Sequence, residues 1–192
     1  MNVYLLSTQG LENHIEQALP LVCENRRQRF LHTHSLETLG AGLLLAKKLG
    51  VHADEDLRCG QHGKPFLTKQ HQFFSLSHSN NQVLLAVDEA PVGADIERMD
   101  RPISQAARNR VCLASERNRD FFTVFTRKEC AMKLTGLGFL LPMDAIDTTK
   151  DFFWEGETYH FHTTVCRDYA VSFLCIDNQL PPIQLLSAED FL

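Results

Sequence analysis

Two acidic residues lie two positions apart in the segment Gly93-Ala94-Asp95-Ile96-Glu97. Successive side chains on a strand alternate between its faces, so Asp95 and Glu97 point the same way while Ile96 points toward the core. Two carboxylates on one face repel each other unless a cation lies between them, and Mg²⁺ prefers oxygen ligands. By itself the pair fits a divalent-metal site or, as the more common case, two solvated acids at a strand end.

An aromatic, an acid and a base recur at helical spacing in residues 125–136, FTRKECAMKLTG. Glu129 and Lys133 are four residues apart and Phe125 is one turn earlier, so the three share one stripe of a helix. As a surface ion pair, the two charges would contribute about 0.3–0.5 kcal/mol. A partly buried site that needs a proton acceptor and a cation would use the same stripe.

Two further segments have the chemistry to bind an anion. Residues 74–79 read FSLSHS, so a strand ends in hydroxyls and an imidazole, and His78 could donate to a phosphate or cap a turn. Gly63-Lys64-Pro65 places a lysine at a rigid turn, where it can meet a phosphate as a point charge. Each signal is weak by itself.

These segments lie in a pattern of short strands and helices. The chain reads helix-rich and then strand-rich, twice over, which predicts an α+β fold of two similar lobes, residues 1–98 and 99–192. The predicted strands are residues 2–8, 73–76, 83–87, 92–96, 159–165 and 169–176, and the predicted helical segments are 11–49, 103–112 and 116–135.

The composition excludes several other classes of protein. The 192 residues are 44% hydrophobic and 22% charged, which is typical of a globular chain large enough to fold without disulfides. A net charge of -5 disfavours general coating of nucleic acid. The six cysteines form no C-x-x-C pair, and neither a signal peptide nor an apolar run long enough for a membrane helix is present. We therefore expect a cytoplasmic protein with reduced thiols and no membrane or nucleic-acid partner.

Together and in chain order, the motifs resemble the Sfp/AcpT-type 4′-phosphopantetheinyl transferase family over about residues 26–138. They are GKP, F-x-L-S-H-S, V-G-x-D-I-E and F-x-x-x-F-T-R-K-E-x-x-x-K-x-x-G, with His78 and Asp95 17 residues apart. The short chain points to the bacterial AcpT-like branch. Such enzymes move the phosphopantetheine arm of coenzyme A onto a serine of an apo acyl or peptidyl carrier protein and release adenosine 3′,5′-bisphosphate. The resemblance implies an enzyme of the holo-[acyl-carrier-protein] synthase type.

The resemblance also implies a fold and a catalytic set. Each lobe would pack a helix-rich part on a small, mostly antiparallel sheet, with a pseudo-twofold between the lobes and the site in their cleft. Asp95, Glu97 and Glu129 would hold Mg²⁺ against the pyrophosphate. Glu129 would also be the general base toward the carrier serine, and Lys133 would neutralise the pyrophosphate. The catalytic residues are then Glu129, Lys133 and Asp95.

Coenzyme A would be gripped by residues from the first lobe. Three departures from the family could affect how coenzyme A binds. Phe125 stands where the family usually has Trp, Ser75 stands where it has Asn, and an Arg is missing near Thr38. The cluster Arg26-Arg27-x-Arg29 must then supply most of the positive charge. The predicted coenzyme A contacts are Lys64, Pro65, Ser77, His78 and Arg26.

A basic stretch predicts how the protein partner docks. Residues 101–128 hold seven basic side chains against Glu116 and Asp120, a local charge of +5. The stretch fits a solvated helical face or a docking surface for the acidic carrier proteins that this family modifies. We expect a monomer that docks the carrier there.

Two other functions share some of these residues. A carrier-binding module that has lost turnover would keep the fold, but the intact Asp95, Glu97, Glu129 and Lys133 argue against it. A Mg²⁺-dependent phosphohydrolase would use the same acids, but the S-H-S and GKP motifs would then have no role.

Overall fold

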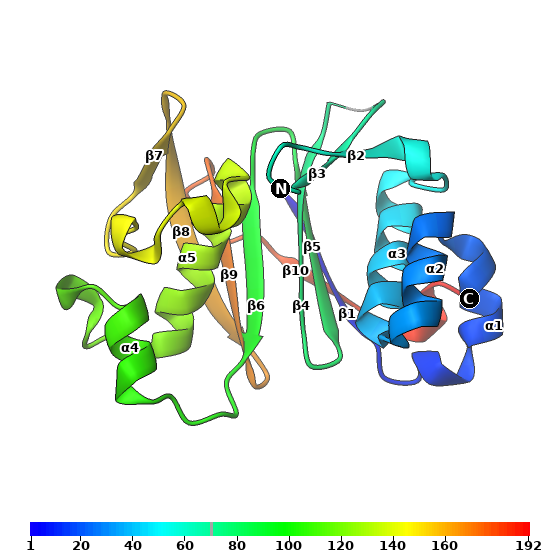
Figure 1. Ribbon diagram of the computed structural model, residues 1–192, viewed down its shortest axis with the longest axis horizontal. Coiled ribbons are helices and arrows are strands. Elements are labelled where there is room, and N and C mark those ends of the chain that lie inside the picture. Colours follow the sequence, from blue (N-terminus) through cyan, green and yellow to red (C-terminus); the bar gives the residue numbers. More distant parts are fainter. Residues whose placement is uncertain (70) are drawn as a thin grey trace.

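The computed structural model describes residues 1–69 and 71–192. Within these residues the chain forms two four-stranded sheets and a short two-stranded hairpin. The two larger sheets lie side by side in the middle of the molecule, with helices outside them at both ends (Figure 1). The mixed helix and sheet content predicted from the sequence is thus confirmed.

The first sheet has the order β10-β1-β5-β4. Only the pairing of β1 with β10 is parallel among the strand pairs that the described residues form in it. Helix α3 covers its outer face, because Leu39, Leu43 and Leu44 recur at helical spacing and are almost fully buried against it, and α2 packs on α3. The bounds are β1 Asn2–Ser7, β4 Phe73–Ser79, β5 Gln82–Asp88, β10 Ile183–Leu186, α2 Glu24–Thr33 and α3 Leu36–Leu49.

The second sheet has the order β6-β9-β8-β7 and is antiparallel. Helix α5 packs on its outer face with the buried residues Cys130, Ala131 and Leu134, and α4 lies beside α5. The bounds are β6 Gly93–Arg98, β7 Phe152–Trp154, β8 Glu157–Cys166, β9 Tyr169–Cys175, α4 Gln105–Val111 and α5 Phe121–Thr135.

The inner faces of the two sheets share one apolar core. Val3, Leu5 and Leu84 of the first sheet pack in one cluster with Ile96 and Phe173 of the second. Burial of this core makes the two halves one packing unit. The remaining elements are α1 Ile15–Ala18, the hairpin of β2 Leu57–Cys59 with β3 Pro65–Leu67, and short 3-10 turns.

The end of the chain crosses the predicted division at residue 98. Strand β10 pairs with β1, and Leu186, Ala188 and Phe191 are buried in the core beneath α3. Residues 183–191 therefore pack with the first half, although they follow the second half in sequence. The pseudo-twofold relation of the lobes stays a prediction.

One predicted helical segment is confirmed and another begins later than predicted. Residues 11–49 are helical in character, as predicted, and form α1, α2 and α3 with short turns between them. The helix predicted at 116–135 begins at Phe121, where the Asp120 side chain accepts the Thr123 amide. Ser115 and Glu116 lie in a 3-10 turn, because the Glu116 carboxylate is drawn inward to Lys128. Among the described residues, no helix combines the length and apolar character needed to cross a bilayer.

Candidate active site

The close approach of α5 to β6 brings the predicted catalytic residues together. A Cβ built at Gly93 would stand 2.0 Å from the Cys130 carbonyl oxygen, so only glycine allows this contact. From there α5 runs past β6, and the Lys133 ammonium reaches Asp95. Gly136, at φ 70°, then ends the helix in the left-handed conformation.

Asp95 is buried, and its two oxygens differ. Its Oδ1 accepts hydrogen bonds from Ser77 Oγ and Lys133 Nζ, each at 2.6 Å. Its Oδ2 has no hydrogen-bond partner among the described residues. A buried carboxylate oxygen without a partner is costly, so this atom calls for a ligand.

Glu97 and Glu129 are the other two predicted acids, and both have raised pKa values. Desolvation is the main cause for each carboxyl, and the negative charge of Asp95 adds to it. Arg101 and Lys133 only partly oppose the rise at Glu97. The negative charge of Asp95 thus helps to raise the pKa of both Glu97 and Glu129, as expected where acids converge.

This donor set fits a divalent cation, which would neutralise the converging charge and occupy the free Asp95 oxygen. However, these three carboxylates do not form a complete metal-coordination site by themselves. In residues 1–69 and 71–192, no three acidic, histidine or cysteine side chains stand close enough to enclose a metal ion. Any bound ion would need oxygens from a substrate or from water to complete its coordination.

Lys133 does not form the surface ion pair that its spacing from Glu129 allows. Its Nζ lies on Asp95, and in the described part of the chain no ion pair joins it to Glu129. The side chain is 27% exposed, so the ammonium is partly open to a ligand.

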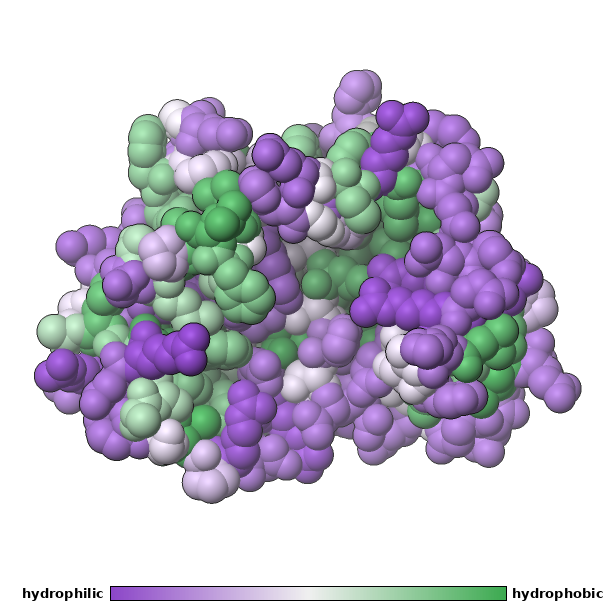
Figure 2. Space-filling model, in the orientation of Figure 1, coloured by the Kyte–Doolittle hydropathy of each residue, from purple (hydrophilic) through white to green (hydrophobic). Residues whose placement is uncertain are grey.

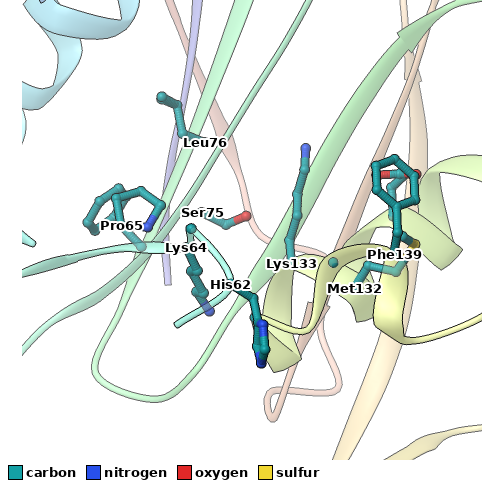
Figure 3. Close-up of a pocket in the computed structure, with 13 residues that line it drawn as sticks. His62, Lys64, Pro65, Ser75, Leu76, Met132, Lys133 and Phe139 are labelled. Atoms are coloured by element: carbon teal, nitrogen blue, oxygen red, sulfur yellow. The ribbon is translucent and has the colours of Figure 1, made fainter. Parts of the chain in front are cut away.

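A cavity of about 270 Å³ lies beside these residues. Figure 2 shows a hollow in the middle of this face, with hydrophobic surface at its floor. Figure 3 shows that Lys64 and Pro65 approach the cavity from one side, and Lys133, Met132 and Phe139 from the other. The remaining lining residues are His62, Gly63, Phe74, Ser75, Leu76, Glu129, Gly136 and Gly138.

Lys64 lines the cavity, but its ammonium is bonded to protein. Nζ donates to the Leu134 carbonyl oxygen at 2.9 Å, near the C-terminal end of α5. Its stem also lies where a Cβ at Gly136 would be in tight contact. Burial lowers the pKa of Lys64 to about 8. The side chain therefore links the loop before β3 to α5.

Ser77 and His78 lie on opposite faces of β4, as strand alternation requires. Ser77 bonds to Asp95, whereas His78 interacts electrostatically with Glu37 and with the cations Arg26 and Arg29. Desolvation lowers the pKa of His78, and Glu37 opposes that shift. The predicted coenzyme A contacts thus form a first group, Arg26 with His78, and a second group, Lys64 with Pro65, that lines the cavity, while Ser77 is bonded to Asp95.

Arg26 belongs to the first group. Burial is the main cause that lowers the pKa of its guanidinium, and the nearby Arg29 adds to it. Thr38, near which the family has an Arg, is buried, and its amide donates to the Ser35 side chain. Its hydroxyl cannot supply the missing positive charge.

Phe125 faces a different hollow. It stacks on Phe121, with ring centroids 5.9 Å apart, and lines a groove of about 860 Å³ between α4, α5 and residues 139–144. Met132 and Phe139 line both this groove and the cavity, so the two are neighbours. Phe139 is 92% exposed, which leaves an apolar ring at their junction.

The basic stretch 101–128 is less basic at its surface than the sequence predicts. Lys128 is fully buried in an ion pair with Glu116 at 2.8 Å. Arg127 points toward the second sheet, where it donates to Thr163 and to the Thr148 carbonyl oxygen. The cations that remain are Arg101, Arg108, Arg110, Arg117 and Arg119.

Comparison with known proteins places the chain in a family. The family model of the 4′-phosphopantetheinyl transferase superfamily matches residues 91–174, a range that contains Asp95, Glu97, Glu129 and Lys133. The 4′-phosphopantetheinyl transferase psf-1 of Bacillus pumilus is 31% identical over 165 residues, 72% of this chain and 70% of the relative.

Two proteins of Bacillus subtilis are also similar. The 4′-phosphopantetheinyl transferase ffp is 31% identical over 105 residues, 48% of this chain and 46% of the relative. A second 4′-phosphopantetheinyl transferase is 26% identical over 153 residues, 71% and 68% of the two chains. The resemblance carried by the motifs is thus confirmed, and the chain belongs to the 4′-phosphopantetheinyl transferase superfamily.

Proposed function

We propose that the protein transfers the phosphopantetheine arm of coenzyme A to a serine hydroxyl of an apo carrier protein and releases adenosine 3′,5′-bisphosphate. The observation that carries this proposal is that Glu129 and Lys133 line one cavity between the two halves and that Lys133 is ion-paired to the buried Asp95 beside it. An acid of raised pKa and an ammonium beside one apolar cavity suit the transfer of a charged group at the end of a long neutral arm.

Each residue has a distinct task in this reaction. Glu129, with its raised pKa, is the proton acceptor for the carrier hydroxyl. Lys133 balances the negative charge of the pyrophosphate while Asp95 fixes its position. Asp95, Glu97 and Glu129 would hold Mg²⁺ together with oxygens from substrate or water, and the ion would supply further charge neutralisation at the phosphorus. Lys64, Pro65, Ser77, His78 and Arg26 remain the proposed coenzyme A contacts.

The direct test is a mass measurement. The protein is incubated with coenzyme A, Mg²⁺ and a panel of apo carrier proteins, and one carrier should gain the mass of one phosphopantetheine group. Excess EDTA and the Asp95→Ala variant should each abolish the gain. The matched control is Asp168→Ala, an exposed acid in the turn between β8 and β9, which should react at the normal rate.

The controls separate the competing functions. Full turnover in EDTA, or in Asp95→Ala, would overturn the metal assignment. Carrier binding without any mass gain would indicate a binding module instead of an enzyme. Release of phosphate from coenzyme A without any carrier would indicate the phosphohydrolase.

A further inference from the structure

Two sheet edges meet directly behind the catalytic acids. Strand β4 is the last strand of the first sheet, and β6 is the last strand of the second. The two strands lie next to each other (Figure 1) without forming one continuous ladder of backbone pairs. Unpaired strand edges expose backbone donors and acceptors, so this seam needs another source of hydrogen bonds.

Three serines of β4 supply them. Ser75, Ser77 and Ser79 are spaced two apart and therefore share the face of β4 that looks onto β6. Ser75 Oγ accepts the Ala94 amide at 2.9 Å and donates to the Ala94 carbonyl oxygen at 3.3 Å. The hydroxyl thus performs both roles that a paired backbone residue would perform.

The other two serines also hold the acids of β6. Ser77 donates to Asp95 Oδ1 at 2.6 Å. Ser79 accepts the Arg98 amide and donates to Glu97 Oε2, both at 3.2 Å. Ser77 and Ser79 are buried, so little water competes for these bonds.

We propose that Ser75, Ser77 and Ser79 form a hydroxyl ladder that joins the two sheets and orients the acids, with Ser79 as the positioning residue for Glu97. Each carboxylate is then held through one oxygen, which sets where the other one points. For Asp95 the oxygen left over is the unpartnered Oδ2. The orienting role rests on the proposed function, because it matters only if these acids hold a cation. The ladder itself does not depend on that function.

The ladder is tested first by hydrogen exchange of single backbone amides, followed by NMR. In Ser79→Ala the Arg98 amide loses its acceptor, and its exchange should become about fivefold faster, the factor expected for one lost hydrogen bond. Ser79→Thr keeps the hydroxyl and should restore the slow exchange. Ser172→Ala is the matched control, because it removes buried hydroxyl bonds to Thr126 and Thr163 in the same half of the molecule without touching β4.

The orienting role is tested with Mn²⁺, whose binding in the presence of coenzyme A is followed by the electron paramagnetic resonance of the free ion. Ser79→Ala should weaken Mn²⁺ binding by about fivefold, with the KM for the carrier unchanged, and Ser79→Thr should recover it. Ser172→Ala should leave Mn²⁺ binding unchanged.

Each result bears on one part of the proposal. Unchanged Arg98 exchange in Ser79→Ala would overturn the ladder. Faster exchange with unchanged Mn²⁺ binding would overturn the orienting role alone. A wild-type protein that transfers nothing would refute the proposed function, and the exchange measurement would still decide on the ladder.

Discussion

The role of a residue in this cleft depends on its position as well as on its type. The sequence predicts that both Lys64 and Lys133 meet a phosphate as point charges. In the structure Lys133 lies on Asp95, whereas Lys64 donates to the end of α5. The difference is positional, because Lys133 is on α5 itself and Lys64 must reach α5 from a loop.

Replacing Lys133 by Ala should reduce kcat/KM by at least about 100-fold, or roughly 2.7 kcal/mol. The reason is that its ammonium is partly open to the cavity and would balance pyrophosphate charge that builds up in the transition state. Steady-state kinetics with coenzyme A and an apo carrier measure the loss. Lys69→Ala removes an exposed ion pair with Asp56 and is the control, with no kinetic change expected. A lower melting temperature with normal kinetics would make Lys133 a structural residue.

The lowered pKa of Lys64 should make the stability of the protein depend on pH. Its pKa falls from 10.5 to about 8 in the folded protein through burial. The folded state therefore binds fewer protons between these values, so the free energy of unfolding should rise with pH across that range, by up to about 1.4 kcal/mol per pH unit. Partial exposure of the side chain will reduce this slope. Urea unfolding of the wild type and of Lys64→Met at pH 7.5, 9 and 10 measures it as a difference. A difference that stays constant with pH would show that Lys64 is well solvated.

At the scale of helices and strands, sequence patterns predicted those features that depend on residues close together in the chain. The leucine spacing of α3 marks its buried face, the apolar run of β5 marks a strand that is buried on both faces, and Gly136 ends α5. The predicted start of α5 at residue 116 was wrong, because Glu116 is buried in an ion pair with Lys128 and the helix begins at Phe121. Strand β10 was not predicted: it has only four residues, and its partner β1 lies at the other end of the chain.

The same limit applies to the site. The motifs predicted Asp95, Glu97, Glu129 and Lys133, and the structure gathers them around one seam. The roles of Ser75 and Ser79 were missed, although alternate serines on one strand are a pattern that the sequence shows. Their acceptors on β6 could not be predicted, because nothing in the sequence says which two sheet edges meet.

The buried pair of Glu116 and Lys128 should be the most sensitive ion pair of the second half. Burial alone would raise the pKa of Glu116, but Lys128 and donors from Leu113 and Thr148 outweigh it and the pKa is lowered. Lys128→Met leaves this carboxylate without its cation, and should lower the free energy of unfolding by about 3–5 kcal/mol at pH 7.

Urea unfolding measures that loss, and the double variant Lys128→Met, Glu116→Gln should recover part of it because no charge is left unpaired. Lys150→Ala, which removes an exposed pair with Asp147, is the control and should change stability by less than about 1 kcal/mol. A loss in Lys128→Met no larger than in that control would show that water reaches the pair.

At the scale of the whole molecule, the halves are joined by a shared core, the serine seam and the returning end of the chain. In the proposed reaction the substrates would meet at a cleft whose two walls come from different halves of the molecule. The cavity is bounded by both halves, whereas the groove beside it belongs to α4, α5 and residues 139–144. A small nucleotide suits the cavity, and a protein surface suits the groove and the arginines around it.

Reversing Arg108 and Arg117 to Glu should raise the KM for an acidic carrier while leaving that for coenzyme A nearly unchanged. These arginines remain at the surface of the stretch 101–128 after Arg127 and Lys128 turn inward. The wild-type rate at limiting carrier should fall with added salt, and the double variant should lose most of that dependence, because screening weakens long-range attraction.

The control for this reversal is Arg58→Glu, an exposed arginine on β2 in the other half, which should behave as wild type. Arg108 also lies over the Phe121 ring and donates to the Arg119 carbonyl oxygen, so the melting temperature must be compared before the kinetics are interpreted. Equal effects on both substrates would place the arginines near coenzyme A. If both Michaelis constants and the salt dependence stay unchanged in a folded variant, the carrier docks elsewhere and these arginines form a solvated helix face.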